Sequence, residues 1–231
     1  MSVYHRNQSD SYQMNHEANT SVFSNQSSVH DDLNTLVEKH TRSVWQEPIP
    51  PHTRDAAKTI IKLLETHKGP LILDSFCGTG MSTAKLGSLY PEALVIGIDK
   101  SANRLGRHVQ TMTNNYRLIR GNCEHIWAQL VSAGIRCTHH YLFYPNPWPK
   151  KAHIKRRVHG HPSFPLLKQL GGSIELRSNW KIYVDEFAAA SRLIGLDAKV
   201  ESLSATDPMT LFERKYAANS ENLWVCRAVA S

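Results

Sequence analysis

Short apolar runs alternate with segments of helical spacing over most of the chain beyond residue 69. A strand followed by a helix, repeated several times, is typical of a parallel sheet covered by helices. Strands are expected at 70–74, 93–98, 116–120, 139–144 and 172–177, and helices at 80–89, 101–112, 124–133, 163–170 and 180–194. Two further apolar runs, 198–203 and 223–228, with no helix expected between them, indicate an antiparallel edge. The pattern predicts an α/β fold with a doubly wound, mostly parallel sheet and an antiparallel C-terminal strand.

The residues before this alternation have a different character. Residues 1–28 are rich in Asn, Gln, Ser and His and contain few apolar side chains, so we expect a disordered polar tail. Residues 31–45 have helical spacing, prolines interrupt it over 46–51, and Thr53 is expected to cap a second helix. We therefore expect one domain over residues 29–231, with 29–68 as its helical lead-in.

Charge and cysteine content narrow the classes of function. The net charge of +7 and the pI near 9.3 fit a surface that binds a polyanion, although many basic proteins bind none. The four cysteines are scattered without a CxxC pair, which indicates free thiols in a reducing cytoplasm and neither a disulfide framework nor a zinc site. No apolar run is long enough to span a membrane, and the N-terminus has no secretory apolar region.

A glycine-containing turn follows the first expected strand. Gly78 and Gly80 allow the backbone to turn tightly beside a ligand, and the next helix directs its N-terminus toward the same place. A nucleotide-binding dehydrogenase would carry a third glycine, which does not follow here. The pattern D-x-x-x-G-x-G, from Asp74 through Phe76 to Gly80, instead resembles the first motif of class I S-adenosylmethionine (SAM) methyltransferases.

Two more polar residues stand where the second and third expected strands end. Asp99 can accept hydrogen bonds from both hydroxyls of a ribose, and Asn122 follows the third strand, where this fold usually places a side chain near the adenine. Strand-end acids and amides are also ordinary turn residues. The expected cofactor-binding set is Asp74, Phe76, Gly78, Gly80, Asp99 and Asn122.

The run Tyr144-Pro145-Asn146-Pro147-Trp148-Pro149-Lys150-Lys151 closes the fourth expected strand. Proline fixes φ and donates no backbone hydrogen bond, so the run is stiff and non-helical. A stiff strip after a buried strand holds Asn146, Trp148 and Lys150 in fixed directions, which suits a site for a flat, polar, negatively charged ligand.

With this run added, the chain resembles the tRNA (guanine-N7)-methyltransferase family over about residues 45–231. The family's P-D-P-W-x-K, basic His/Arg stretch, T-D and T-x-F-E have counterparts at 145–150, 153–157, 178–180 and 210–215. The resemblance implies a Rossmann-like class I methyltransferase that uses SAM to form 7-methylguanosine in the variable loop of tRNA, working as a monomer or homodimer. It places Asn146 at the catalytic position, and the implied substrate-binding residues are Lys150, His153, Arg156, Arg157, Asn179, Thr210 and Glu213.

Three positions depart from the family, because Asn122, Asn146 and Asn179 stand where it has acids. Guanine N7 carries an in-plane lone pair and no proton, so the reaction needs no general base. Catalysis then depends on positioning and electrostatics, and an asparagine oxygen can still accept hydrogen bonds from guanine N1 and N2. Glu213 keeps one negative charge in the set. We expect a slower or differently tuned enzyme.

A basic stretch follows the proline run. Residues 148–161 contain five Lys or Arg, three His and no acid, which favours a phosphate-binding loop over a merely solvated face. Trp148 is either a packed loop anchor or a stacking partner for a splayed base. The histidines lack the cysteines or acids of a metal site, so no metal is expected. A non-catalytic RNA-binding relative and a methyltransferase for another RNA or a small purine-like molecule remain as alternatives.

Overall fold

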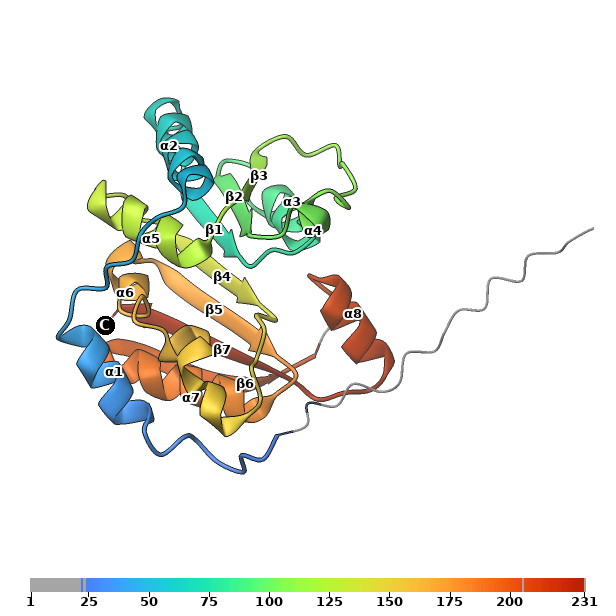
Figure 1. The fold of residues 1–231 in the computed structure, drawn as a ribbon. Helices are drawn as coiled ribbons and strands as arrows, with labels where there is room; N and C mark the ends of the chain where they lie inside the picture. The colour runs from blue at the N-terminus through green and yellow to red at the C-terminus, as the bar shows by residue number, and fades with distance from the viewer. Residues whose placement is uncertain (1–21, 23, 205, 231) are drawn as a thin grey trace, which may run out of the picture.

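The structure is a computed structural model, which describes residues 22, 24–204 and 206–230 (Figure 1). Its centre is a seven-stranded sheet in the order β3-β2-β1-β4-β5-β7-β6. The strands are β1 (Leu71–Ser75), β2 (Leu94–Asp99), β3 (Tyr116–Arg120), β4 (His139–Phe143), β5 (Ser173–Ser178), β6 (Leu196–Leu203) and β7 (Leu223–Ala230). The strands from β1 to β5 pair in parallel, and β7 lies antiparallel between β5 and β6. The predicted α/β fold and its antiparallel C-terminal strand are confirmed.

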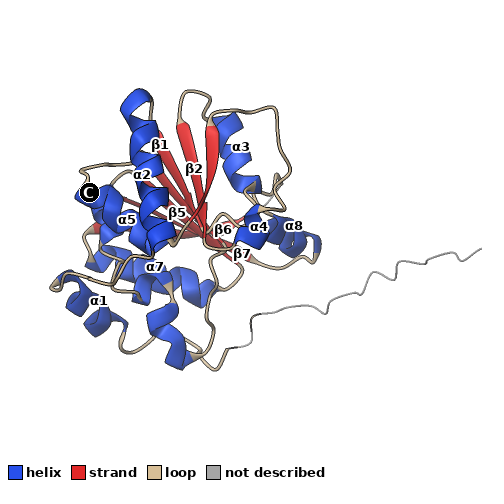
Figure 2. Ribbon diagram, turned by 45° about the horizontal axis from the view of Figure 1, so that its top comes forward, coloured by secondary structure: helices blue, strands red, loops and turns tan. Residues whose placement is uncertain are grey.

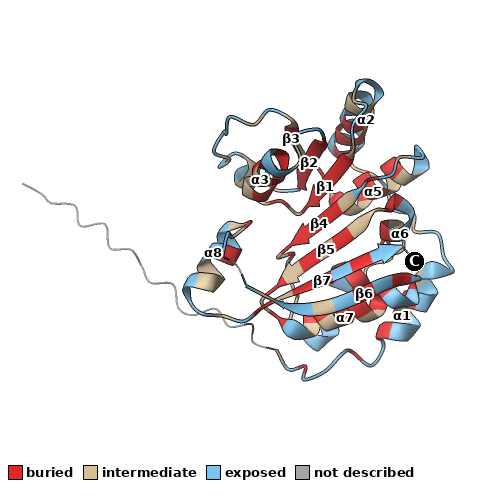
Figure 3. Ribbon diagram, turned by 180° about the vertical axis from the view of Figure 1, so that it is seen from behind, coloured by how far each residue is buried: buried red, intermediate tan, exposed pale blue. Residues whose placement is uncertain are grey.

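Helices cover both faces of the sheet (Figure 2). One layer contains α1 (Leu33–Thr41), α2 (Pro51–Thr66), α5 (Cys123–Ser132), α6 (Leu166–Leu170) and α7 (Lys181–Leu193), whose apolar side chains form one continuous core with the sheet. A smaller core on the other face includes residues of α3 (Met81–Leu89) and side chains of β4. Every residue of β1 and β2 is buried because helices cover both of their faces, whereas half of the residues of β6 are exposed (Figure 3).

Several expected elements differ from the structure. The helix expected over 101–112 is only the single turn α4 (Ala102–Leu105). Val109 and Met112 are exposed, so the rest of that segment has no buried apolar face to stabilise a helix. The connection between β6 and β7, expected to lack a helix, contains α8 (Leu211–Ala218). The helix expected over 163–170 begins only at α6.

Thr53 lies inside α2 and does not cap it. Pro51 occupies the first helical position, where the missing N–H is not needed, so the helix starts earlier than predicted. The Thr53 hydroxyl instead accepts a hydrogen bond from the backbone amide of Asn122 at 3.3 Å. The side chain therefore joins the helical lead-in to the loop that follows β3.

Most of the polar tail expected over 1–28 lies outside the described residues, but 24–28 pack against the domain. Gln26 is buried, and its amide donates to the carboxylate of Glu186 in α7. The Ser24 hydroxyl donates to the carbonyl of Pro149 at 2.7 Å. Residues before position 29 therefore also contact the domain. No helix among the described residues combines the length and the apolar character needed to cross a membrane.

Candidate active site

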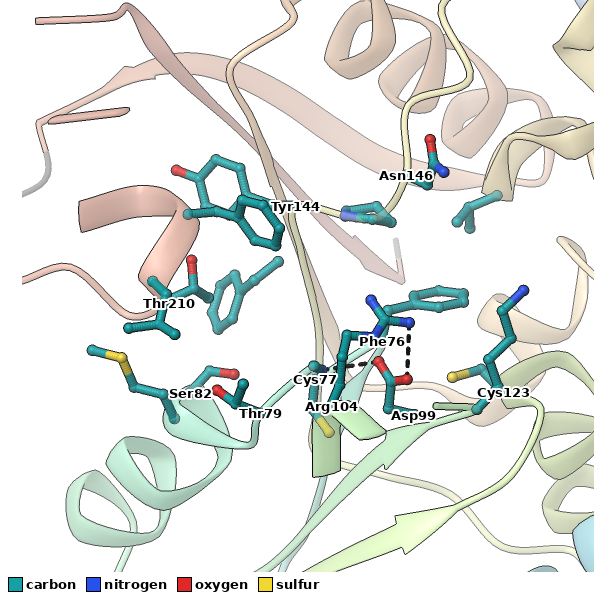
Figure 4. A pocket seen from close by; sticks show the side chains of 18 of the residues that line it. Phe76, Cys77, Thr79, Ser82, Asp99, Arg104, Cys123, Tyr144, Asn146 and Thr210 are labelled. Carbon is teal, nitrogen blue, oxygen red and sulfur yellow. Dashed lines mark hydrogen bonds and ion pairs between the residues drawn. The ribbon is translucent and has the colours of Figure 1, made fainter. Parts of the chain in front are cut away.

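A cavity of about 620 Å³ opens at the carboxyl ends of the central parallel strands (Figure 4). Ligands of open α/β sheets bind at this edge, and the volume suits a nucleotide-sized molecule. Its walls come from the loops after β1, β2, β3 and β4 and from the start of α8. Thr210 and Asn146 lie on different sides of the opening, with Asp99 below them (Figure 4). One cavity therefore joins four of the expected cofactor residues to three of the expected catalytic and substrate residues: Phe76, Gly78, Asp99 and Asn122, and Asn146, Arg156 and Thr210.

The loop after β1 forms one wall of the cavity. Phe76 and Gly78 both have positive φ values, 63° and 61°, and both line the cavity. A Cβ at Gly78 would meet nothing within 4 Å, so its backbone faces open space. Gly80 precedes α3 with φ 77°, and a Cβ there would lie 2.6 Å from the Leu118 side chain. Gly80 shapes the turn but does not line the cavity.

Asp99 ends β2 with only 1% of its side chain exposed. Its carboxylate accepts hydrogen bonds from the backbone amides of Gly78 (3.0 Å) and Ser101 (2.8 Å). The Arg104 guanidinium makes an ion pair with the same carboxylate at 2.9 Å. Asp99 lines the cavity beside the open backbone of Gly78, so the residues present fit the ribose of an adenosine-containing cofactor.

Asp74, expected to bind the cofactor, is fully buried and does not line the cavity. One carboxylate oxygen accepts hydrogen bonds from the hydroxyls of Ser82 (2.7 Å) and Thr83 (2.6 Å) at the start of α3. Burial raises the pKa of Asp74 to about 6, although the two hydroxyl hydrogen bonds act in the opposite direction. Asp74 therefore acts on the site through the position of α3.

Asn122 lines the cavity, as expected, and also caps α5. Its side-chain oxygen accepts a hydrogen bond from the His125 amide at 3.1 Å. The oxygen is therefore engaged in the cap, and the NH₂ group is the part of the side chain left to act as a donor.

The proline run forms the opposite wall. Tyr144 and Trp148 have positive φ values of 52° and 46°, an uncommon conformation for side chains of this size. The Asn146 side-chain oxygen accepts a hydrogen bond from the Trp148 amide at 3.2 Å, and Asn146 is exposed at the cavity. The Arg156 guanidinium lies 4.9 Å from the centre of the Trp148 ring, while His153 meets that ring edge-on. Trp148 is thus a half-buried part of the cavity wall.

Arg157, expected to bind substrate, has no exposed surface. Its guanidinium makes an ion pair with Glu186 at 2.5 Å and donates to the carbonyls of Trp148 (3.2 Å) and Lys150 (3.4 Å). Burial alone would raise the pKa of Glu186, but the hydrogen bonds and charges of His159 and Arg157 outweigh it and hold that pKa at about 2. Arg157 therefore supports the proline run from inside and does not face RNA.

Four other expected substrate residues also lie outside the cavity lining. Glu213 is fully buried, pairs with Arg177 at 2.9 Å and accepts from the Tyr144 hydroxyl at 3.1 Å. The side-chain amide of Asn179 donates to the carboxylate of Glu221 at 2.9 Å and makes no capping hydrogen bond to α7. Lys150 is exposed and His153 half-buried outside the cavity lining. Thr210 and Arg156 do line it, as expected.

Some residues at the mouth of the cavity were not predicted from the sequence. Phe212 is 53% exposed and lines the cavity together with Lys215. Both lie on α8, which begins where the Thr210 hydroxyl accepts from the Glu213 amide at 3.0 Å. A Thr followed three residues later by Glu is a helix-start signal that could have located α8. Arg104 was missed because it resembles any exposed helical arginine.

Known proteins are similar to this chain in sequence. A family model described as "Putative methyltransferase" matches residues 68–226. Relatives named tRNA (guanine-N(7)-)-methyltransferase, from Mycolicibacterium gilvum and Thiobacillus denitrificans, are both 27% identical, over 180 and 170 residues. Each match covers 67% of this chain, and the chain spans 66% and 73% of the two relatives.

Solved structures are similar in fold. A 16S rRNA (adenine(1408)-N(1))-methyltransferase from Catenulisporales acidiphilia has a TM-score of 0.53 at 16% identity, over 75% of this chain and 91% of that one. A structure described as an antibiotic related methyltransferase has a TM-score of 0.56 at 12% identity, over 82% of this chain and 97% of that one. The fold, the cavity and the family match agree, and the chain belongs to this methyltransferase family.

Proposed function

We propose that this protein transfers the methyl group of SAM to N7 of a guanine in tRNA, within the variable loop. The observation that carries the proposal is the single cavity that holds Asp99 and Gly78 at one end and Asn146 and Trp148 at the other. A cofactor and a base bound at these two ends would share one space. The names of the relatives support tRNA as the substrate.

The residues that would hold SAM lie in the loops after β1, β2 and β3. Asp99 is placed to accept from ribose hydroxyls, the open backbone at Gly78 leaves room for close approach, and the Asn122 NH₂ group can donate to the adenine. When bound, SAM supplies an electrophilic methyl group on a cationic sulfur. The protein's own contribution is to orient the acceptor base and keep water away from it.

Asn146 would orient the guanine. Because its side-chain oxygen already accepts from the Trp148 amide, its NH₂ group is the free donor at the cavity. Guanine presents O6, an acceptor, beside N7 on the same edge. A donor at O6 aligns N7 without competing for its lone pair, so the amide can orient the base through a hydrogen bond that a carboxylate cannot donate.

Cations at the mouth would bind the RNA backbone. Arg156, Lys215, Lys100 and Arg107 line the cavity from different elements, and Lys155 is exposed next to Arg156. Phosphate contacts of this kind position RNA without reading its sequence. These cations take the RNA-binding role that the family resemblance implied for Arg157. The working form is proposed to be a monomer or homodimer in the cytoplasm.

The proposal is tested with methyl-labelled SAM and two acceptors, an unmodified tRNA transcript and free guanosine. We expect label in tRNA, at a rate that falls steeply as salt rises, and almost none in guanosine. Comparable labelling of guanosine, insensitive to salt, would favour a small purine-like substrate. No label while both tRNA and SAM bind would favour a non-catalytic RNA-binding protein.

A further inference from the structure

Arg104 lies across the cofactor end of the cavity (Figure 4). It is the last but one residue of the short helix α4, and its side chain remains 40% exposed while the carboxylate it contacts is 1% exposed. An arginine paired to an otherwise buried acid at a ligand site is available to leave, because water can solvate its guanidinium once the acid has another partner.

The contacts and the burial of Asp99 show why Arg104 would leave. A carboxylate has about four lone-pair positions. Two are used here by the backbone amides of Gly78 and Ser101, and the Arg104 guanidinium lies 2.9 Å from the oxygen that Ser101 also contacts. Because only 1% of the Asp99 side chain is exposed, the two hydroxyls of a ribose can reach its remaining positions only if one of these groups moves aside. The two amides are fixed in the backbone, whereas the Arg104 side chain can rotate.

The released guanidinium would remain at the mouth of the cavity. Lys100 and Arg107 line the same side and flank Arg104 in the sequence. With Arg104 detached from Asp99, this side gains a third cation free to bind a phosphate. Its charge is neutralised by Asp99 as long as the ion pair persists.

We propose that Arg104 couples the two ligands: it pairs with Asp99 in the empty enzyme, gives way to the ribose of the cofactor, and then binds a phosphate of the RNA. This inference rests on the proposed function, because it takes the cofactor to be SAM and the polyanion to be tRNA. Coupling of this kind is reciprocal, so each ligand raises the affinity for the other by the same factor. The cofactor thereby strengthens RNA binding without touching the RNA.

The test is the Kd for unmodified tRNA, measured by fluorescence anisotropy with and without saturating S-adenosylhomocysteine. This product carries no sulfonium charge, so it cannot itself attract the RNA phosphates more strongly. We expect it to tighten tRNA binding to the wild-type protein by about fivefold or more. In Arg104→Gln the tightening should vanish, while S-adenosylhomocysteine alone binds at least as tightly as to wild type.

The matched control is Arg107→Gln, which removes one cation from the same side of the mouth. We expect weaker tRNA binding with and without S-adenosylhomocysteine, at an unchanged ratio of the two Kd values. An absence of tightening in the wild-type protein, or its persistence in Arg104→Gln, would overturn the inference alone. Failure of tRNA to bind under either condition would overturn the proposed function as well.

Discussion

Replacement of Arg157 should destabilise the fold of this protein and not only weaken its binding of RNA. Arg157→Met keeps a long apolar chain but removes a guanidinium that has no exposed surface. The carboxylate of Glu186, equally buried, then loses the charge that balances it. Removing one partner of a buried ion pair typically costs about 3–5 kcal/mol of stability. For a domain of this size that corresponds to a melting temperature lower by about 6–20 °C.

Arg156→Met is the matched control, because Arg156 is adjacent in sequence but exposed above the Trp148 ring. We expect its melting temperature within about 2 °C of wild type, with weaker tRNA binding. Thermal unfolding followed by circular dichroism, and tRNA anisotropy below both transitions, separate the two effects. The double variant Arg157→Met/Glu186→Gln should recover part of the loss, since it no longer buries an unpaired charge. Wild-type stability of Arg157→Met, with RNA binding as weak as in Arg156→Met, would refute the buried assignment.

Three further predictions concern the site and the buried residues that support it. Asn146→Asp should slow methylation of tRNA about tenfold, with unchanged S-adenosylhomocysteine binding, because a carboxylate cannot donate to guanine O6; faster turnover would show that negative charge is what the position needs. Glu213→Gln should raise the KM for tRNA and speed hydrogen exchange in α8, because Glu213 holds Arg177 and Tyr144 against that helix; unchanged exchange would mean that it is not the anchor. The pKa of Asp74 is about 6 in the folded protein, against an ordinary value of 3.8 for an unfolded chain. The folded protein therefore holds this proton more tightly, and wild type loses about 3 kcal/mol of stability as the pH rises between these two values. Asp74→Asn should not show this loss, which urea titration at several pH values can measure. The same dependence of the free energy of unfolding on pH in both proteins would contradict the argument from burial.

The sheet and its ligand-binding edge could be predicted because their determinants are local. Each central strand is a nearly continuous apolar run, Asp99 ends one strand, and Asn122 lies two residues after the next. Parallel strands deliver their carboxyl ends to one edge, so strand order and strand ends suffice to assemble that side of the cavity. The residues that the structure gathers there include Phe76, Gly78 and Asn146.

The roles of the charged residues could not be predicted, because they depend on distant partners. Arg156 and Arg157 are indistinguishable in a basic run, but only Arg157 turns inward, where it meets Glu186 from α7 and Gln26 from the N-terminal segment. Glu213 likewise belongs to a helix-capping pattern in the sequence, but in the structure it is buried and pairs with Arg177 on β5. Both assignments need the tertiary packing that brings these elements together.

The most direct test of the central claim is nucleoside mass spectrometry of tRNA treated with this protein and SAM. The substrate is tRNA that lacks 7-methylguanosine, digested to nucleosides after incubation, with Asn146→Ala as the matched control for contaminating activity. We expect 7-methylguanosine to appear with the wild-type protein and to be strongly reduced with the variant. Its absence, with SAM and tRNA both bound, would contradict the assignment of this cavity to guanine N7 methylation.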